Sequence, residues 1–206
     1  MPNTRLAVLC SGEGTNLQAI ITAIRRRKLS AQIAVVVSDK PQARALKRAR
    51  RAGICAVHLD PKAYRTRAGY DAALVRVIKK AGARWVVLAG FMRILSAGFI
   101  RKFPNRVFNI HPALLPAFRG GSAVEDALSY GVKVTGVTVH FADAKVDHGP
   151  VILQAVVPVK PKDTKATLLR RVHQVEHQIY PKAIGLAVRG KLKVRGRKVV
   201  VQGGKK

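Results

Sequence analysis

Residues 6–24 read LAVLCSGEGTNLQAIITAI, and this stretch decides the fold. Its first part, 6–10, is a continuous apolar run of strand length that ends at the turn-forming pair Ser11 and Gly12. Further on, apolar side chains recur at the spacing of one helical face, at Leu17, Ile20, Ile21 and Ile24. A buried strand, a glycine-rich loop and a helix, in this order, are typical of the first unit of an α/β protein.

The same alternation continues through the first half of the chain. Continuous apolar runs predict strands over 33–37, 55–59 and 85–89, and helical patterns that stop at a glycine predict helices over 42–52 and 68–81. Strands without polar alternation are typical of parallel sheets that are buried on both faces. We therefore expect an α/β fold, doubly wound, with a mostly parallel sheet and helices on both faces.

The second half is richer in β-structure. A strand over 107–111 is broken by Pro112, the segments 133–141 and 151–159 alternate in part, and a helix with a polar face is predicted over 167–184. No linker rich in Gly, Pro and Ser separates the halves, so the sequence predicts one domain. The basic segment from Gly190 either pairs as a small hairpin or frays.

The composition excludes several classes of protein. Of 206 residues, 48% are hydrophobic, and no uncharged apolar stretch reaches the roughly 18 residues of a membrane span. The apolar run near the N-terminus is too short for a signal peptide, so we expect a cytoplasmic protein that does not bind membranes. Cys10 and Cys55 lie in apolar segments without neighbouring ligand residues, and we expect both to be buried rather than to bind metal or form a disulfide.

The net charge is unusually high. The chain has 39 Lys and Arg but 10 Asp and Glu, for a formal charge of +29. Such a field attracts polyanions, so nonspecific nucleic-acid binding stays open. Because the basic residues are spread along the chain, a generally overcharged surface is favoured over one dedicated nucleic-acid groove.

The glycine-rich loop is the first candidate binding site. Residues 11–16 lie between the first strand and the first helix, at the sheet edge where doubly wound folds bind ligands. Glycines allow close approach of a ligand, and the helix N-terminus favours a phosphate. The loop is neither a dinucleotide fingerprint nor a P-loop. The alternative is a tight turn in which Thr15 or Asn16 caps the helix.

The second candidate site combines an amide, an imidazole and a carboxylate. Asn109 and His111 are two residues apart on a strand, so their side chains point to the same face. An amide can donate to a developing oxyanion while an imidazole transfers a proton, which suits acyl transfer. Asp147, one of few acids in the chain, stands in a tight turn, and beside His111 it would orient the ring and raise its pKa. The alternative is a hydrogen-bonded structural pair.

Six motifs together resemble phosphoribosylglycinamide formyltransferase, a folate-dependent family of purine biosynthesis. They span nearly the whole chain, in the family's order and spacing, at 11–20, 88–96, 109–116, 138–141, 147–152 and 176–181. The resemblance implies a formyltransferase domain over 1–189, followed by the basic tail 190–206. It also implies transfer of a formyl group from 10-formyltetrahydrofolate to the amine of glycinamide ribonucleotide, with no metal.

The resemblance also assigns roles to residues. His111 would be the proton donor, Asn109 would stabilise the oxyanion, and Asp147 would tune His111. The residues implied in binding the ribonucleotide are Gly14, Thr15, Asn16, His173, Gln174, Val175 and Glu176. Those implied in binding the folate are Arg67, Met92, Arg93, Ile94, Leu95, Asn109, Asp143, Ala144, Lys145, Val146 and Asp147. A cis peptide bond is expected between Leu115 and Pro116.

Some features favour other readings. The segment Phe118-Arg119-Gly120 departs from the family pattern and is similar to methionyl-tRNA formyltransferase, although that family has an additional tRNA-binding domain. The related deformylase has an N-terminal regulatory domain that the present sequence lacks. A basic RNA-binding module would interleave aromatic with basic residues, which the runs 25–28 and 44–51 do not. The oligomeric state stays open between monomer and homodimer.

Overall fold

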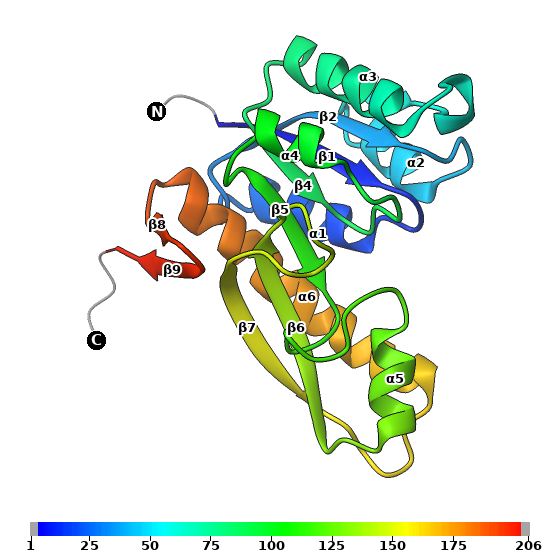
Figure 1. Ribbon diagram of the computed structural model, residues 1–206, viewed down its shortest axis with the longest axis vertical. Coiled ribbons are helices and arrows are strands. Elements are labelled where there is room, and N and C mark those ends of the chain that lie inside the picture. Colours follow the sequence, from blue (N-terminus) through cyan, green and yellow to red (C-terminus); the bar gives the residue numbers. More distant parts are fainter. Residues whose placement is uncertain (1–3, 203–206) are drawn as a thin grey trace. The chain divides into compact units, whose positions relative to one another are not determined.

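A computed structural model describes residues 4–202 of the chain. These residues form two compact units that divide between Phe108 and Asn109 (Figure 1). Strand β5 (Val107–His111) contains this division, so it brings the chain from the first unit into the second.

The first unit contains a parallel sheet with the strand order β3-β2-β1-β4. Its strands are β1 (Arg5–Cys10), β2 (Gln32–Ser38), β3 (Ala56–His58) and β4 (Trp85–Leu88). Val8, Val36 and Val87 from its three longest strands are fully buried. The continuous apolar runs therefore become strands covered on both faces.

The helices of the first unit follow from the strand order. They are α1 (Thr15–Arg25), α2 (Arg44–Arg51), the short 3₁₀ helix η1 (Pro61–Ala63), α3 (Arg67–Lys80) and α4 (Ala97–Lys102). The chain steps from β1 to β2 to β3 in one direction and then returns to β4 on the other side of β1. Right-handed crossovers consequently place α1 and α2 on one face and α3 on the other. The loops after β1 and β4 lie where this direction reverses, the usual ligand-binding position.

The second unit is built around an antiparallel pair and a long helix. Its elements are α5 (Ala123–Tyr130), β6 (Val134–Phe141), β7 (Val151–Pro158), α6 (Lys165–Val188), β8 (Leu192–Arg195) and β9 (Lys198–Val201). Helix α6 packs on β6 and β7 (Figure 1). Their shared core consists of Val124, Val137, Val157, Leu168 and Val172. Helix α6 begins with a capping box formed by Thr164 and Thr167.

The predicted fold class is confirmed. The sheet is mostly parallel in the first unit and mixed in the second, where β6–β7 and β8–β9 are antiparallel. The expected cis bond between Leu115 and Pro116 is present. Helices α4 and α5 were not predicted, because each has at most eight residues and shows too short a periodic pattern.

The two cysteines differ in their surroundings. Cys10 is buried in β1, and burial raises the pKa of its thiol to about 12. Cys55 is exposed, so the expectation that both are buried was wrong. The reason is that Cys55 directly precedes β3, the edge strand of the parallel sheet, where covering elements are fewer. Among residues 4–202, no helix has the length and apolarity needed to cross a membrane.

Candidate active site

The second unit brings Asn109, His111 and Asp147 together. Asn109 and His111 stand on one face of β5, as their spacing predicts, and His111 is buried. Asp147 Oδ2 lies 3.2 Å from His111 Nδ1, and Asp147 Oδ1 accepts a hydrogen bond of 3.0 Å from Asn109 Nδ2. The carboxylate therefore contacts both residues that the sequence singled out.

Asp147 is held in an uncommon backbone conformation. Its φ angle is 47°, in the left-handed region that residues other than glycine seldom adopt. Its Oδ2 atom also accepts a hydrogen bond of 3.0 Å from the backbone N–H of Gly120. Such a conformation persists where surrounding contacts fix it, and it is frequent at functional sites.

His140, on β6, is a member of this cluster that was not proposed as a site residue. Its Nδ1 atom lies 3.0 Å from the carbonyl oxygen of Phe141, and its Nε2 atom lies 3.1 Å from Asn109 Nδ2. With the proton on Nδ1, Nε2 accepts from the amide, and both contacts are satisfied. Two features of the sequence could have indicated that His140 belongs to the site. Thr138 and His140 lie on the same face of one strand, and the family motif 138–141 contains His140.

The far side of the His111 ring faces a loop. His111 Nε2 lies 2.7 Å from the carbonyl oxygen of Phe118, whose φ of 48° is also left-handed. This loop is tied down near its start, where Thr138 Oγ1 accepts from the N–H of Leu115 at 3.0 Å and donates to the carbonyl of Ala113 at 2.7 Å. Both ring nitrogens of His111 thus have protein neighbours.

Burial and charge act in opposite directions in this cluster. Burial lowers the pKa of His111 and outweighs the Asp147 carboxylate and the Phe118 carbonyl, which raise it. Burial acts to raise the pKa of Asp147, but His140, the Gly120 N–H and His111 together hold it below its ordinary value. Asp147 is consequently ionised at neutral pH and available to orient His111.

The glycine-rich loop of the first unit leaves the start of α1 without a side-chain cap. Gly14 occupies the N-cap position with φ 71°, and no side-chain cap hydrogen bond is formed there. The alternative in which Thr15 or Asn16 caps the helix was therefore wrong. A Cβ on Gly14 would lie 2.8 Å from the Cα of Ala45 in α2, so only glycine fits. The positive end of the α1 dipole at this glycine favours an anion.

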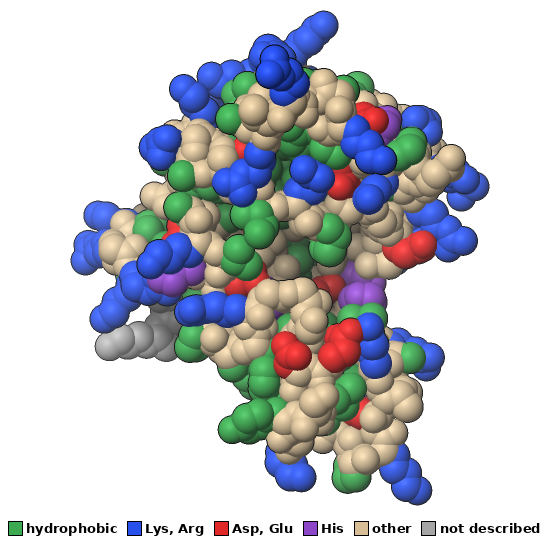
Figure 2. All heavy atoms as spheres, turned by 45° about the vertical axis from the view of Figure 1, so that its right-hand side comes forward, with side chains coloured by type: hydrophobic (Ala, Val, Ile, Leu, Met, Phe, Trp, Pro, Cys, Tyr) green, Lys and Arg blue, Asp and Glu red, His purple; other side chains and the backbone are tan. Residues whose placement is uncertain are grey.

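Basic side chains of α2 neutralise and brace this loop. Arg44 Nη1 pairs with the Glu13 carboxylate at 3.0 Å, and Arg48 Nε donates to the Glu13 carbonyl at 2.8 Å. A negative side chain next to the anion site is thereby compensated. Elsewhere, Lys and Arg side chains are spread over the face drawn in Figure 2 rather than gathered in one place.

The loop between β4 and α4 is fixed at both ends within the first unit. Met92 N–H donates to Ser11 Oγ at 2.9 Å, and Ser96 N–H donates to Asp71 Oδ2 at 2.8 Å. Between these anchors the side chains of Met92 and Ile94 are 75% and 60% exposed, although large apolar side chains are usually covered. The loop thus presents exposed apolar side chains on a backbone held at two points.

The remaining predicted residues have different surroundings. Leu95 is buried, the Arg93 guanidinium lies 5.2 Å from the centre of the Tyr70 ring, and Arg67 is the first residue of α3. On α6, Glu176 is buried, Gln174 is exposed, and Val175 packs against the core of the second unit. Burial lowers the pKa of His173, which also stacks on His177.

Segment 143–147 of the second unit, which the resemblance implies in folate binding, is a turn at the end of β6. Asp143 Oδ1 accepts from the Lys145 N–H at 2.9 Å, which closes the turn. The side chain of Val146 is 47% exposed. Ala144, between these residues, carries no polar side chain. The structure therefore groups the three residues that were predicted to be catalytic, and it presents the other predicted residues separately in each unit.

Comparisons with known proteins agree with these observations. The formyl transferase family profile matches residues 4–184. Phosphoribosylglycinamide formyltransferase of Escherichia coli (strain K12) is 43% identical over 92% of this chain and 89% of its own. The crystal structure of glycinamide ribonucleotide transformylase 1 from Symbiobacterium toebii superposes with a TM-score of 0.96 at 50% identity, covering 97% of this chain and 94% of that chain.

A longer relative shows the same similarity over one part of its length. The human trifunctional purine biosynthetic protein adenosine-3 is 48% identical over 90% of this chain, which spans 18% of that protein. The match to the E. coli protein, in contrast, covers most of both chains. The chain belongs to the formyl transferase family, and within it to the phosphoribosylglycinamide formyltransferases.

Proposed function

We propose that this protein transfers the formyl group of 10-formyltetrahydrofolate to the amine of glycinamide ribonucleotide. The observation that carries the proposal is the 3.2 Å contact between Asp147 Oδ2 and His111 Nδ1, with Asn109 bonded to the same carboxylate. An oriented imidazole beside an amide donor can serve proton transfer and oxyanion stabilisation in one acyl-transfer step.

The reaction assigns a proton path to His111. The substrate amine bonds to the formyl carbon, the formyl oxygen becomes an oxyanion, and collapse breaks the bond to the folate nitrogen. The net proton moves from the amine to the departing nitrogen. Because Asp147 faces Nδ1, His111 Nε2 is the atom that delivers the proton, and the Phe118 carbonyl 2.7 Å away has to release it.

Asn109 needs a similar exchange of partners. Its Nδ2 atom has two protons, and acceptors for both are within reach, namely Asp147 Oδ1 at 3.0 Å and His140 Nε2 at 3.1 Å. Donation to an oxyanion therefore replaces one of these bonds. The charge that develops on the oxygen makes this new hydrogen bond stronger in the transition state than in the ground state.

We assign the substrate-binding roles within each unit separately. In the first unit, the uncapped start of α1 at Gly14, Thr15 and Asn16 suits the phosphate of the ribonucleotide. The exposed Met92 and Ile94 suit the aromatic part of the folate, and Arg67 suits a carboxylate of its glutamate tail. In the second unit, His173 and Glu176 of α6 are assigned to the ribonucleotide, and loop 143–147 to the folate.

The donor molecule supplies the activated carbon, so the protein contributes orientation and electrostatics. We also propose that the protein works in the cytoplasm on these small molecules, as a monomer or homodimer. The domain assignment, 1–189 for catalysis and 190–206 for the tail, stays part of this proposal. Nonspecific nucleic-acid binding through the charge of +29 remains a separate expectation.

One assay tests the proposal. The protein is incubated with 10-formyltetrahydrofolate and either glycinamide ribonucleotide or methionyl-tRNA, and the formylated acceptor is identified. We expect formylation of glycinamide ribonucleotide and its loss in His111→Ala. Formylation of the tRNA instead would show that the segment Phe118-Arg119-Gly120 marks another acceptor. Release of formate without any acceptor would identify a hydrolase.

A further inference from the structure

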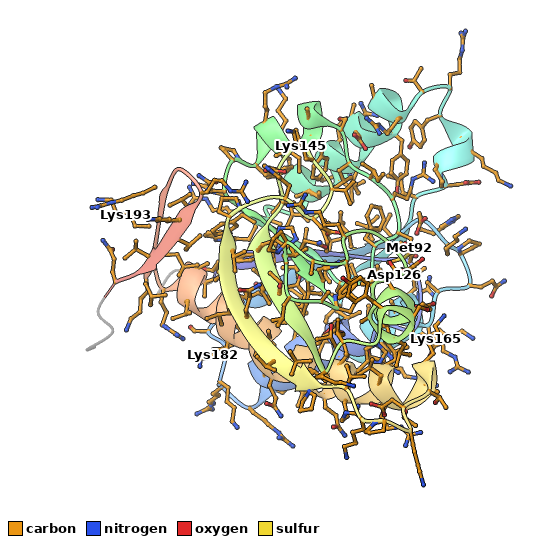
Figure 3. The ribbon with its side chains drawn as sticks, turned by 60° about the horizontal axis from the view of Figure 1, so that its bottom comes forward. Met92, Asp126, Lys145, Lys165, Lys182 and Lys193 are labelled. Atoms are coloured by element: carbon orange, nitrogen blue, oxygen red, sulfur yellow. The ribbon has the colours of Figure 1, made fainter. Side chains whose placement is uncertain are left out.

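The basic C-terminal segment forms a hairpin beside the active-site turn. Strands β8 and β9 are antiparallel, and Lys198 of β9 pairs with Val151 at the start of β7. Residues 147–150 directly precede β7, so the hairpin turn at Gly196 and Arg197 is near them. Lys193 of the same hairpin is exposed and points away from the protein (Figure 3).

Arg197 is the hairpin residue that contacts this turn. Its Nη2 atom donates to the carbonyl oxygen of His148 at 2.8 Å, and its Nη1 atom lies 3.0 Å from His148 Nε2. His148 Nδ1 in turn lies 2.7 Å from Asp143 Oδ2. With a proton on Nδ1, His148 donates to Asp143, and Arg197 Nη1 lies against the ring, 3.0 Å from Nε2 and 3.2 Å from Nδ1.

These contacts hold both ends of loop 143–147. Burial acts to raise the pKa of Asp143, but hydrogen bonds from His148 and the Lys145 N–H outweigh it and hold the pKa below its ordinary value. Asp143 is therefore ionised at neutral pH and a strong acceptor. The loop is closed on itself through His148, and Arg197 fixes His148 from outside the loop.

Asp147 needs such support because of its backbone. The left-handed conformation of Asp147 is unfavourable for a residue with a side chain, so contacts around it have to hold it in place. On its C-terminal side, Gly149 is packed so tightly that a Cβ would lie 1.8 Å from the Phe141 carbonyl oxygen. Arg197 binds the carbonyl of the peptide between His148 and Gly149, one residue after Asp147. It therefore holds the backbone on the C-terminal side of Asp147, whose carboxylate contacts His111.

We propose that the β8–β9 hairpin positions Asp147 for catalysis through the hydrogen bonds of Arg197 to His148. Arg197 is a positioning residue, since its contacts are with His148 and not with the reacting groups. The inference rests on the proposed role of Asp147 beside His111. It gives the C-terminal segment a task that its charge alone does not explain.

Steady-state kinetics of Arg197→Ala test the proposal. We expect kcat to fall about tenfold with KM for both substrates within about twofold, because a misplaced catalytic group costs turnover. Arg197→Lys, which keeps a donor for the carbonyl, is expected to recover part of this loss. Arg195→Ala removes the same side chain from an exposed position of the same hairpin and is expected to leave kcat unchanged.

Two further measurements separate positioning from general destabilisation. The pKa of His111, followed by NMR, is expected to fall in Arg197→Ala, because the carboxylate that raises it is displaced. In an Asp147→Asn background, Arg197→Ala is expected to cost little more, since a residue that acts through Asp147 has nothing left to position. Thermal unfolding midpoints of all variants record any loss of folded protein.

The outcomes are distinguishable. If Arg197→Ala matches Arg195→Ala in kcat and in the His111 pKa, the hairpin does not position Asp147. An equal cost of Arg197→Ala with and without the Asp147 carboxylate overturns the proposal as well. If Asp147→Asn itself retains full turnover, the role of Asp147 fails, and the inference fails with it.

Discussion

His111 Nε2 lies 2.7 Å from the carbonyl oxygen of Phe118, on the side of the ring opposite to the Asp147 carboxylate. A carbonyl and a carboxylate are both acceptors, so the ring satisfies both only when each nitrogen carries a proton. A neutral ring satisfies one of them. The protonation state of His111 is therefore coupled to the loop that contains Phe118.

Asp147→Asn and His111→Ala are expected to reduce kcat by at least about 100-fold while changing KM little, because both groups act where protons and charge move. Since the carboxylate raises the pKa of His111, the alkaline limb of the pH–rate profile, where the proton donor loses its proton, should move to lower pH in Asp147→Asn. Steady-state kinetics over pH check this. Wild-type turnover with an unmoved alkaline limb would make Asp147 structural.

Stability is expected to fall as the solution is acidified below about pH 6.5. The pKa values of His111, His173 and His177 are lowered from 6.5 by burial, so in this range the unfolded chain binds more protons than the folded one. Their contribution is fully present above the unfolded pKa and is lost as pH falls. Urea unfolding at several pH values measures the slope. His177→Gln should reduce this slope, because one of the histidines with a lowered pKa is removed.

Gly14→Ala is expected to destabilise the first unit and to weaken binding of the ribonucleotide. The new Cβ would lie 2.8 Å from the Ala45 Cα at a φ of 71°, so the loop and α2 have to separate. Gly12→Ala is the matched control, since its Cβ would meet nothing within 4 Å. Urea unfolding and KM for the ribonucleotide are the readouts. Equal behaviour of the two variants would contradict the close packing of Gly14.

Thr164→Ala is expected to lower the free energy of unfolding by about 1 kcal/mol, because it removes the side-chain cap of α6. Thr164 Oγ1 accepts from the Thr167 N–H, and the Thr167 hydroxyl accepts from the Thr164 N–H. The exposed Lys162→Ala serves as control, and both are compared in urea. A cost no greater than that of the control would show that α6 is held by its packing alone.

The salt dependence of kcat/KM is expected to be nearly flat, whereas retention on nucleic acid should fall steeply with salt. The run 25–28 at the end of α1 is exposed and lies outside every segment assigned to a substrate. Its neutralisation should therefore leave the kinetics intact. A tenfold fall of kcat/KM at low salt in that variant would instead indicate substrate steering.

The sequence predicted the elements of this structure whose side chains follow a regular pattern along the chain. Apolar runs such as 6–10 determine strands by burial on both faces, and the strand period places Asn109 and His111 side by side. Asp147 could be proposed as their partner because acids are few in this chain. The fold class and the family followed from these patterns.

The remaining contacts of the candidate site depend on irregular loop conformations, which leave no regular pattern in the sequence. The Gly120 N–H and the Phe118 carbonyl reach Asp147 and His111 through positive φ angles in one loop, which residue identity did not reveal. His140 enters the cluster only through its position on β6. The contact between Arg197 and His148 depends on pairing of β9 with β7, which links segments about fifty residues apart.

Arg48 should be kept when the positive charge of this chain is reduced by design, because it binds the glycine-rich loop. Its guanidinium serves the backbone of the glycine-rich loop, whereas the cations at 25–28 are exposed. A variant of lower charge, intended for purification free of nucleic acid or for crystallisation, would replace the latter first. Sequence composition ranks these arginines as interchangeable, but replacing Arg48 would remove the hydrogen bond to the Glu13 carbonyl and loosen the glycine-rich loop.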